Sequence, residues 1–207
     1  AGIAYSYQVK DSKGCVSTPA TITLSQPTVL DATATATAFS CSATNTKQSA
    51  TVTIAVPTTG TSPYEYSFNG GGYGATRVLS VNDNGSDQIV TYSVRDAKGC
   101  TDGGSVTLLK LNPPTALAFA NAAITCTATT TTVTVTATNG VGILQYETIT
   151  PSPIIRGQQT SNSFANLTPG TYLFKVTDAN GCYYTDTYEI KAVVPIAISG
   201  NVDTNVK

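Results

Sequence analysis

Histidine, methionine and tryptophan are absent from the 207 residues of this chain. Without histidine the chain has no imidazole to act as a general base, to activate a serine nucleophile or to bind a metal. Charged residues are scarce, at 11% against about 25% in a typical soluble domain. The formal net charge of −1 argues against a nucleic-acid or anionic-membrane surface, because either needs a clustered basic patch.

Long apolar runs are missing as well. None approaches the ~18 residues of a membrane-spanning helix, and no secretory leader is visible at Ala1. No direct membrane insertion is therefore expected of this segment. Because the chain starts within a strand motif, we expect it to be a window cut from a longer protein.

An alternating strand, a tight turn and a cysteine occur together three times. The three copies end at Cys15, Cys100 and Cys182, which lie 85 and 82 residues apart. Threonine, a β-branched residue that suits a half-exposed pleated surface, is abundant between them. The period predicts tandem domains of roughly 80–85 residues.

The repeat predicts two complete domains and two fragments. Residues 28–113 and 114–194 each form a complete Ig-like repeat, residues 1–27 are the C-terminal strands of a truncated repeat, and residues 195–207 are the first strand of a further truncated repeat. Each complete unit shows about seven short strands with turn signals every 8–12 residues, as in an Ig-like sandwich. The predicted fold class is all-β, with tandem Ig-like or PKD-like β-sandwich domains in a linear array.

The first strand of each complete unit is expected to be long. It alternates from Leu30 to Cys41 in the first unit and runs from Leu117 to Cys126 in the second. Asn45–Ser49 is expected to be a polar turn.

The segment from Leu167 to Tyr172 resembles a tyrosine corner, in which a Tyr hydroxyl bonds back to the preceding loop. Val90 stands at the position of Tyr172 in the first unit, so that unit is expected to lack this device or to replace it.

An aspartate precedes each of the three cysteines by four residues, at Asp11, Asp96 and Asp178. These could be catalytic carboxylates, but the preferred interpretation is structural, because Asp at the start of a turn bonds its own backbone two residues on. The segment from Asp83 to Asp87 departs from the order of an EF-hand calcium loop and is expected to be a polar turn. We predict no catalytic residue, no cofactor and no metal site, and we expect that the chain is not an enzyme.

Five cysteines in such a chain predict disulfides and an oxidising compartment. Pairing within each unit gives Cys41–Cys100 and Cys126–Cys182, with the partner of Cys15 outside the window. Pairing across the linker gives Cys15–Cys41 and Cys100–Cys126, which repeats just as cleanly. The first scheme is preferred because each domain then closes its own core. It requires the first strand to kink or change sheets, since bridged Cα atoms must lie about 4.4–6.8 Å apart.

A second cysteine follows the signature cysteine by 26 residues both times, at Cys41 and Cys126. The same step from Cys182 predicts a further cysteine at position 208 of a longer sequence.

Three tyrosines, Tyr73, Tyr183 and Tyr184, lie in or beside expected loops. Their rings can stack on a sugar, although packing at an edge or interface is the preferred interpretation.

The ending Val-Thr-Asp-Ala-Asn-Gly-Cys at Cys182, the segment Pro63–Phe68 and the segment Leu167–Tyr172 resemble the SprB-type repeat of very large Bacteroidota surface adhesins. The resemblance covers both complete units and both fragments. It implies export by the type IX secretion system, display on the outer membrane and adhesion, with gliding motility as the best-known use. It supplies no catalytic residues.

The expected function is a structural stalk segment that extends a distal adhesive region from the cell. A carbohydrate-binding or accessory module of a secreted protein, and a self-assembling extracellular filament subunit, are the alternatives. The expected partners are neighbouring repeats of the same chain, then surface polysaccharide or other cell-surface proteins. We expect no nucleic-acid partner.

Overall fold

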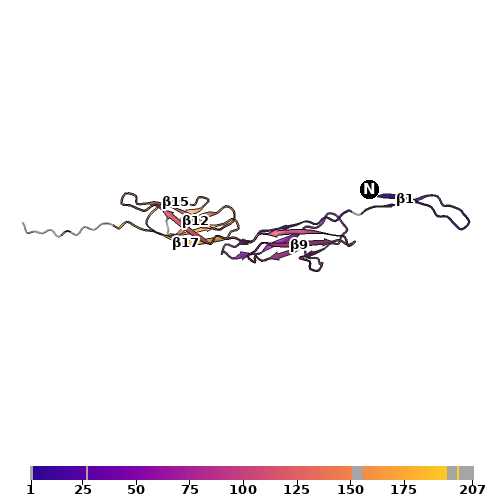
Figure 1. Ribbon diagram of the computed structural model, residues 1–207, viewed down its shortest axis with the longest axis horizontal. Helices are drawn as coiled ribbons and strands as arrows, with labels where there is room; N and C mark the ends of the chain where they lie inside the picture. The colour runs from indigo at the N-terminus through magenta and orange to yellow at the C-terminus, as the bar shows by residue number, and fades with distance from the viewer. Residues whose placement is uncertain (1, 27, 151–155, 195–199, 201–207) are drawn as a thin grey trace, which may run out of the picture. The chain divides into compact units, whose positions relative to one another are not determined.

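The computed structural model describes residues 2–26, 28–150, 156–194 and 200. Within these ranges all regular structure is β, in seventeen strands, and no helix is present (Figure 1). No described element is thus a helix long and apolar enough to cross a membrane. This confirms the all-β fold class.

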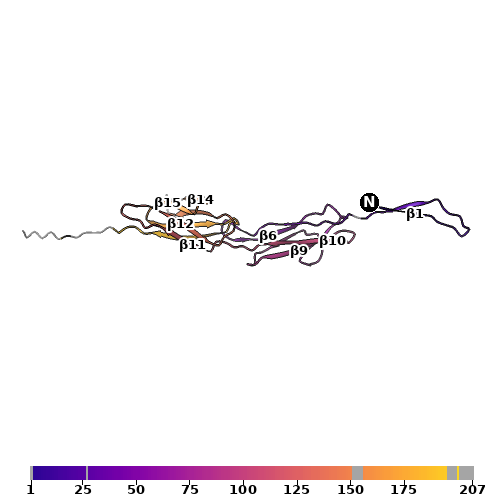
Figure 2. The ribbon, with the colours of Figure 1, turned by 45° about the horizontal axis from the view of Figure 1, so that its top comes forward.

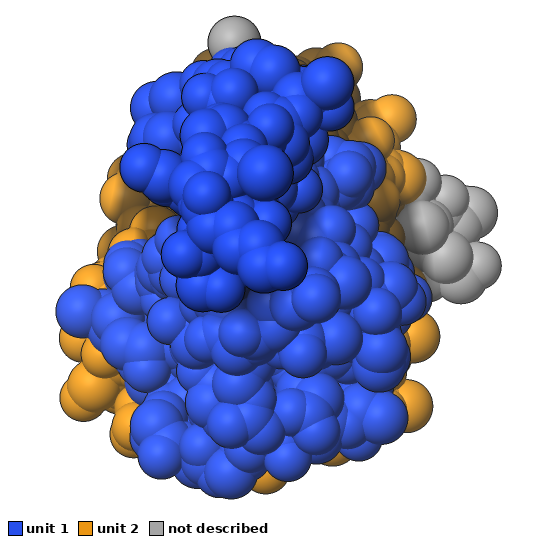
Figure 3. Space-filling model, turned by 90° about the vertical axis from the view of Figure 1, so that its right-hand side faces the viewer, with its two compact units in different colours: residues 1–37, 51–81, 88–108 blue, residues 38–50, 82–87, 109–207 orange. Residues whose placement is uncertain are grey.

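The chain divides into two compact units, which are coloured separately in Figure 3. Unit 1 comprises Ala1–Thr37, Thr51–Val81 and Gln88–Leu108, and unit 2 comprises Ala38–Ala50, Asn82–Asp87 and Leu109–Lys207. The loops 38–50 and 82–87, which the sequence assigns to the repeat 28–113, therefore group with the residues from 109 onward. The predicted repeat boundaries stay predictions.

Unit 2 contains two larger antiparallel sheets, ordered β11-β12-β15 and β14-β13-β16-β17, and the short hairpin of β4 (Ser40–Cys41) and β5 (Lys47–Gln48). Figure 1 labels β12, β15 and β17 of the larger sheets, and Figure 2 labels β11, β12, β14 and β15. The strands of the two larger sheets are β11 (Ala116–Asn121), β12 (Thr131–Thr138), β13 (Gln145–Thr150), β14 (Arg156–Gln159), β15 (Ser163–Leu167), β16 (Gly170–Thr177) and β17 (Tyr183–Ile190). Seven strands divided three and four between two sheets match the strand number of an Ig-type sandwich.

The core of unit 2 follows from alternation along its strands. Val133 and Val135 of β12 and Phe174 and Val176 of β16 are almost fully buried, while the residues between them are more exposed. These side chains belong to one apolar cluster although they come from different sheets, so the two sheets face each other across it. Each such side chain contributes about 1.5–3 kcal/mol of burial free energy.

Unit 1 contains two three-stranded sheets, ordered β3-β6-β8 and β10-β9-β7, and a separate hairpin, β1-β2. Its strands are β1 (Ile3–Tyr7), β2 (Ala20–Leu24), β3 (Ala34–Ala36), β6 (Ala50–Ile54), β7 (Glu65–Phe68), β8 (Val78–Val81), β9 (Gln88–Arg95) and β10 (Thr101–Leu108). Ile54 of β6, Tyr66 of β7 and Val94 of β9 share one core cluster with Leu30 and Ala32. Residues from both sheets thus meet in one core here as well.

The prediction of one long first strand from Leu30 to Cys41 is wrong. The segment forms β3 and, after a break, β4 (Ser40–Cys41), which pairs with β5 (Lys47–Gln48) and not with β6. Phe39 lies in the break, and its side chain is buried, with 1% exposed. The second unit departs in the same way, because β11 ends at Asn121 and leaves Cys126 in a loop.

Candidate functional site: a disulfide-linked loop and turn

The signature turn, which we define as Asp178–Cys182, links β16 to β17. The amide N–H of Asp178 donates to the carbonyl oxygen of Cys182 at 2.9 Å, and the Gly181 N–H donates to the Asp178 carbonyl at 3.0 Å. The carboxylate oxygen Oδ1 of Asp178 accepts from the N–H groups of Asn180 and Cys182, at 2.9 and 3.0 Å. Gly181 has φ of 77°, a left-handed conformation that glycine adopts at little cost.

The same turn is built at Asp96 and at Asp11. Asp96 Oδ1 accepts from Lys98 and Cys100, and Asp11 Oδ1 accepts from Lys13 and Cys15, all at 2.9 Å. The prediction that these aspartates bond their own turns is therefore confirmed.

At Asp96 and Asp178 the other carboxylate oxygen accepts a hydrogen bond from a nearby loop. Asp96 Oδ2 accepts from the Thr61 N–H at 3.0 Å, and Asp178 Oδ2 accepts from the Val141 N–H at 3.3 Å. Burial would raise the pKa of Asp96, but hydrogen bonds from the N–H groups of Thr61, Cys100 and Lys98 outweigh it and lower that pKa below 3.8. The carboxylate is thus held ionised as a structural acceptor.

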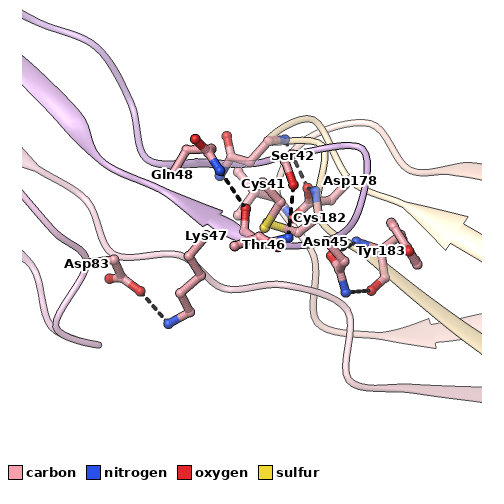
Figure 4. The surroundings of a disulfide bond; sticks show 12 residues. Cys41, Ser42, Asn45, Thr46, Lys47, Gln48, Asp83, Asp178, Cys182 and Tyr183 are labelled. Atoms are coloured by element: carbon pink, nitrogen blue, oxygen red, sulfur yellow. Dashed lines mark hydrogen bonds and ion pairs between the residues drawn. A yellow bond between two sulfur atoms is a disulfide. The ribbon is translucent and has the colours of Figure 1, made fainter.

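Cys182 is bonded to Cys41, with an S–S distance of 2.01 Å and a Cα–Cα distance of 4.8 Å (Figure 4). The predicted pairs Cys41–Cys100 and Cys126–Cys182 are therefore not formed, and Cys15, Cys100 and Cys126 are exposed free thiols. The predicted pairing fails because the strand breaks before Cys41, so that this cysteine lies in the hairpin β4-β5 and not in the sheet of β3. The bond joins residues 141 positions apart, from different sequence repeats and within unit 2.

Backbone contacts hold the Cys41 loop against the turn. The Cys41 N–H donates to the Asn180 carbonyl at 2.9 Å. The Asn45 side chain pairs with the backbone of Tyr183, donating from Nδ2 to its carbonyl and accepting from its N–H at Oδ1, both at 2.9 Å (Figure 4). Asn45 has φ of 59°, which asparagine tolerates better than most residues.

An ion pair fixes the far end of the same loop. The Lys47 ammonium lies 2.7 Å from Asp83 Oδ2 (Figure 4), and the Asp83 side chain is 1% exposed while that of Lys47 is 59% exposed. The hydrogen bond from Lys47 lowers the pKa of Asp83 below 3.8, helped by the N–H groups of Gly85 and Leu111 and opposed by burial. The segment Asp83–Asp87 is a polar turn, as predicted, since Ser86 donates its N–H to Asn84 Oδ1 at 2.9 Å.

The loop tyrosines have neighbours from their own chain. The Lys175 ammonium lies 4.7 Å from the Tyr183 ring centre, and the Arg95 guanidinium lies 4.4 Å from that of Tyr73. Tyr184 and Tyr183 line a shallow hollow of about 350 Å³ beside Cys41 and Pro113. Cations already lie over two of the three rings, so the sugar-stacking interpretation gains no specific support.

The predicted tyrosine corner is present in unit 2. The Tyr172 hydroxyl donates to the Thr168 carbonyl at 2.9 Å, and the side chain is 1% exposed. Val90, at the equivalent position in unit 1, is buried as an aliphatic side chain.

Sequence reasoning identified Cys41, Cys182 and Asp178 but not the residues that bring them together. Asn45 was expected only to belong to a polar turn. Asn180 contacts Cys41 through its backbone carbonyl, so the contact does not depend on the side chain at that position and the sequence does not indicate it. The repeated segment Cys-Ser-Ala-Thr at Cys41 and Cys-Thr-Ala-Thr at Cys126 is the signal that marks this loop as a recurrent element. The arrangement supplies covalent attachment and hydrogen bonding.

No protein-family model matches the chain, and no curated protein matches it. Among solved structures, one match is the C-terminal 282-residue fragment of intimin in complex with the translocated intimin receptor (Tir) intimin-binding domain. The identity is 14% and the TM-score 0.38, over 80% of this chain and 64% of that one. The chain thus spans less than two thirds of the fragment. A likeness this low carries no argument about function.

Proposed function

We propose that this chain is a structural stalk segment of a large repetitive cell-surface adhesin. In this proposal tandem Ig-like domains form a linear array that extends a distal adhesive region from the cell. The single observation that carries it is the Cys41–Cys182 bond, which links two sequence repeats across 141 residues. A covalent link of that span has a direct mechanical consequence.

Tension applied to the two ends of the chain is transmitted through the sulfur–sulfur bond. The residues between Cys41 and Cys182 are bypassed, so they release no length if their sheets open. A separation of 141 residues corresponds to about 480 Å of extended chain. The bond therefore limits how far the stalk lengthens under load.

The compartment follows from the same bond. Disulfides form and persist outside the cytosol, which supports an extracellular location. Export by the type IX secretion system, attachment at the outer membrane and use in gliding motility rest on the SprB-type resemblance of the signature turns and belong to the proposal.

Single-molecule stretching of the chain, held at its two ends, tests this function. The oxidised chain is expected to release about 480 Å less length on full unfolding than the same chain after reduction. The Cys41→Ser/Cys182→Ser variant should behave as the reduced chain does. Cys126→Ser is the matched control, because it removes an exposed thiol and leaves the bond intact. Equal release from oxidised and reduced chains would reject the mechanical role.

A further inference from the structure

Three free thiols occupy positions that are equivalent to the bonded ones. Cys100 and Cys15 end signature turns, as Cys182 does, and Cys126 matches Cys41 in the repeat. The Cys41–Cys182 bond therefore indicates which kind of segment could bond each exposed thiol.

The turn at Cys100 has the geometry of the bonded turn. Gly99 has φ of 82° and Gly181 of 77°. Thr101 pairs with Arg95 in the same register in which Tyr183 pairs with Thr177, and β10 and β17 are both edge strands. Thr101 on the edge strand β10 therefore corresponds to Tyr183, whose backbone N–H and carbonyl bond the Asn45 side chain.

The space beside the Cys100 turn is open, whereas the corresponding space beside the Cys182 turn is occupied by the Cys41 loop. A Cβ added at Gly181 would lie 3.0 Å from the Cys41 carbonyl oxygen, whereas one added at Gly99 would meet nothing within 4 Å. A hollow of about 270 Å³ lies there, lined by residues entering the repeat, from Thr28 to Leu30, and by Cys100. The hollow beside Tyr183 is lined by the corresponding entry residues and, on its other side, by Cys41, Asn45 and Lys47.

The loop at Cys126 shares the sequence and the chain position of the bonded loop, although Cys126 lies in a bend and not in a hairpin such as β4-β5. We define the cysteine loops as Cys41–Thr44 and Cys126–Thr129. Each begins five residues after its repeat's first strand, at Ala36 or Asn121, and each has Ala and Thr at its third and fourth positions. Thr130 replaces Asn45, so the paired hydrogen bonds to Tyr183 are not repeated by the same side chain.

We propose that Cys41–Cys182 is one of a series of identical bonds, each joining the cysteine loop of one repeat to the signature turn of the next. Cys100 accepts the cysteine loop of the repeat before its own, and Cys126 bonds the signature turn of the repeat after its own. By the spacing of the observed bond, the partner of Cys126 lies roughly 141 residues toward the C-terminus. This inference rests on the geometry of the turns and on the sequence and position of the loops, and not on the mechanical role.

Each bond forms by oxidation of two thiols. The two Sγ atoms join, and their two protons and two electrons pass to a disulfide oxidant, whose S–S bond breaks to give a dithiol. Since Cys126 lies inside the closed loop from Cys41 to Cys182, successive loops overlap. Reduction of one bond then leaves the stretch from Cys126 to Cys182 within the neighbouring loop.

Disulfide mapping of the complete protein, isolated from its own cells, tests the series. Free thiols are blocked with iodoacetamide, the protein is digested without reduction, and the Cys41–Cys182 peptide serves as an internal control. Cys126 is expected in a cross-link to an Asp-x-x-Gly-Cys segment and Cys100 in a cross-link to a Cys-[Ser/Thr]-Ala-Thr segment, both outside residues 1–207. Alkylated Cys100 and Cys126, a Cys100–Cys126 bond, or glutathione on either would overturn it.

A variant of the complete protein gives a second readout. Cys126→Ser is expected to expose one new alkylatable thiol, in the signature turn of the following repeat. If no thiol appears there, the series is rejected. The stretching experiment tests a separate claim. If all the bonds are present but the oxidised and reduced chains release equal length, only the mechanical role is rejected.

Discussion

Asp178 holds its turn together through Oδ1 and bonds the loop at Val141 through Oδ2, so removal of that carboxylate leaves three N–H groups without their acceptor. Asp178 is 5% exposed. Asp178→Ala is therefore expected to lower the free energy of unfolding by about 2–4 kcal/mol, measured by urea denaturation.

Asp11→Ala is the matched control for that change. Asp11 makes the same two contacts at Oδ1, but its turn lies exposed in the β1-β2 hairpin, where water replaces the lost acceptor. Its loss should cost less than about 1 kcal/mol. Equal losses at the two positions would contradict a structural role that depends on burial.

Gly181 and Gly99 form a second matched pair. Alanine at either position adopts a left-handed conformation, at a cost of about 1–2 kcal/mol. Only at Gly181 does the added methyl also press on the Cys41 carbonyl. In a glutathione redox buffer, Gly181→Ala is expected to shift Cys41–Cys182 toward the reduced form, and Gly99→Ala is not. Identical redox behaviour would show that the turn and the loop are not in contact.

Asp83 gives a pH dependence of known sign. Its pKa is lowered in the folded chain, chiefly by Lys47, so the ion pair stabilises the fold fully above pH 3.8 and the contribution is lost as the pH falls through the lowered pKa. Because Lys47 is largely exposed, the gain over Asp83→Asn should be only about 0.5–1 kcal/mol at pH 7. Unfolding curves from pH 7 to pH 2 should show the difference decrease as the pH falls below 3.8. A difference that stays the same from pH 7 to pH 2 would exclude the ion pair as its source.

At the scale of elements, the strands and turns were predictable and the route of the first strand was not. Val133, Phe174 and Val176 alternate with polar residues, which determines their strands locally. Apolar residues occupy the even positions from Leu30 to Ala38, but Phe39 and Cys41 occupy odd positions, so the alternation changes phase where the strand breaks. The pattern thus marks the break, but it does not show that β4 pairs with β5, because that pairing depends on contacts that the alternation does not encode.

The cysteine pairing was unpredictable for a related reason. In a periodic chain every offset between the two classes of cysteine repeats equally well, so spacing alone cannot choose among them. Only the position of the hairpin β4-β5 brings Cys41 to Cys182. The Asn45 side chain bonds the backbone of Tyr183, and the backbone carbonyl of Asn180 accepts from the Cys41 N–H; sequence patterns do not reveal bonds to backbone groups.

The bond between these elements has a thermodynamic consequence. Closing a loop of 141 residues removes entropy from the unfolded chain, worth about 5 kcal/mol in the loop-closure model. Cys41→Ser/Cys182→Ser is expected to lower the total free energy of unfolding by about 3–5 kcal/mol in urea. Cys100→Ser/Cys126→Ser removes two exposed thiols and should change it by less than about 0.5 kcal/mol. A similar loss in both double variants would refute the assignment.

For the whole molecule, the central claim is that covalent bonds link one sequence repeat to the next. Trypsin leaves Cys15 and Cys41 on one peptide, since no lysine or arginine separates them, but cleavage before Asp31 divides them. Digestion of the unreduced 207-residue chain with trypsin and an Asp-specific protease therefore isolates each cysteine, and mass spectrometry identifies its partner. The account predicts one cross-link, Cys41 to Cys182, with Cys15, Cys100 and Cys126 as thiols. A Cys41–Cys100 or Cys126–Cys182 cross-link would contradict it.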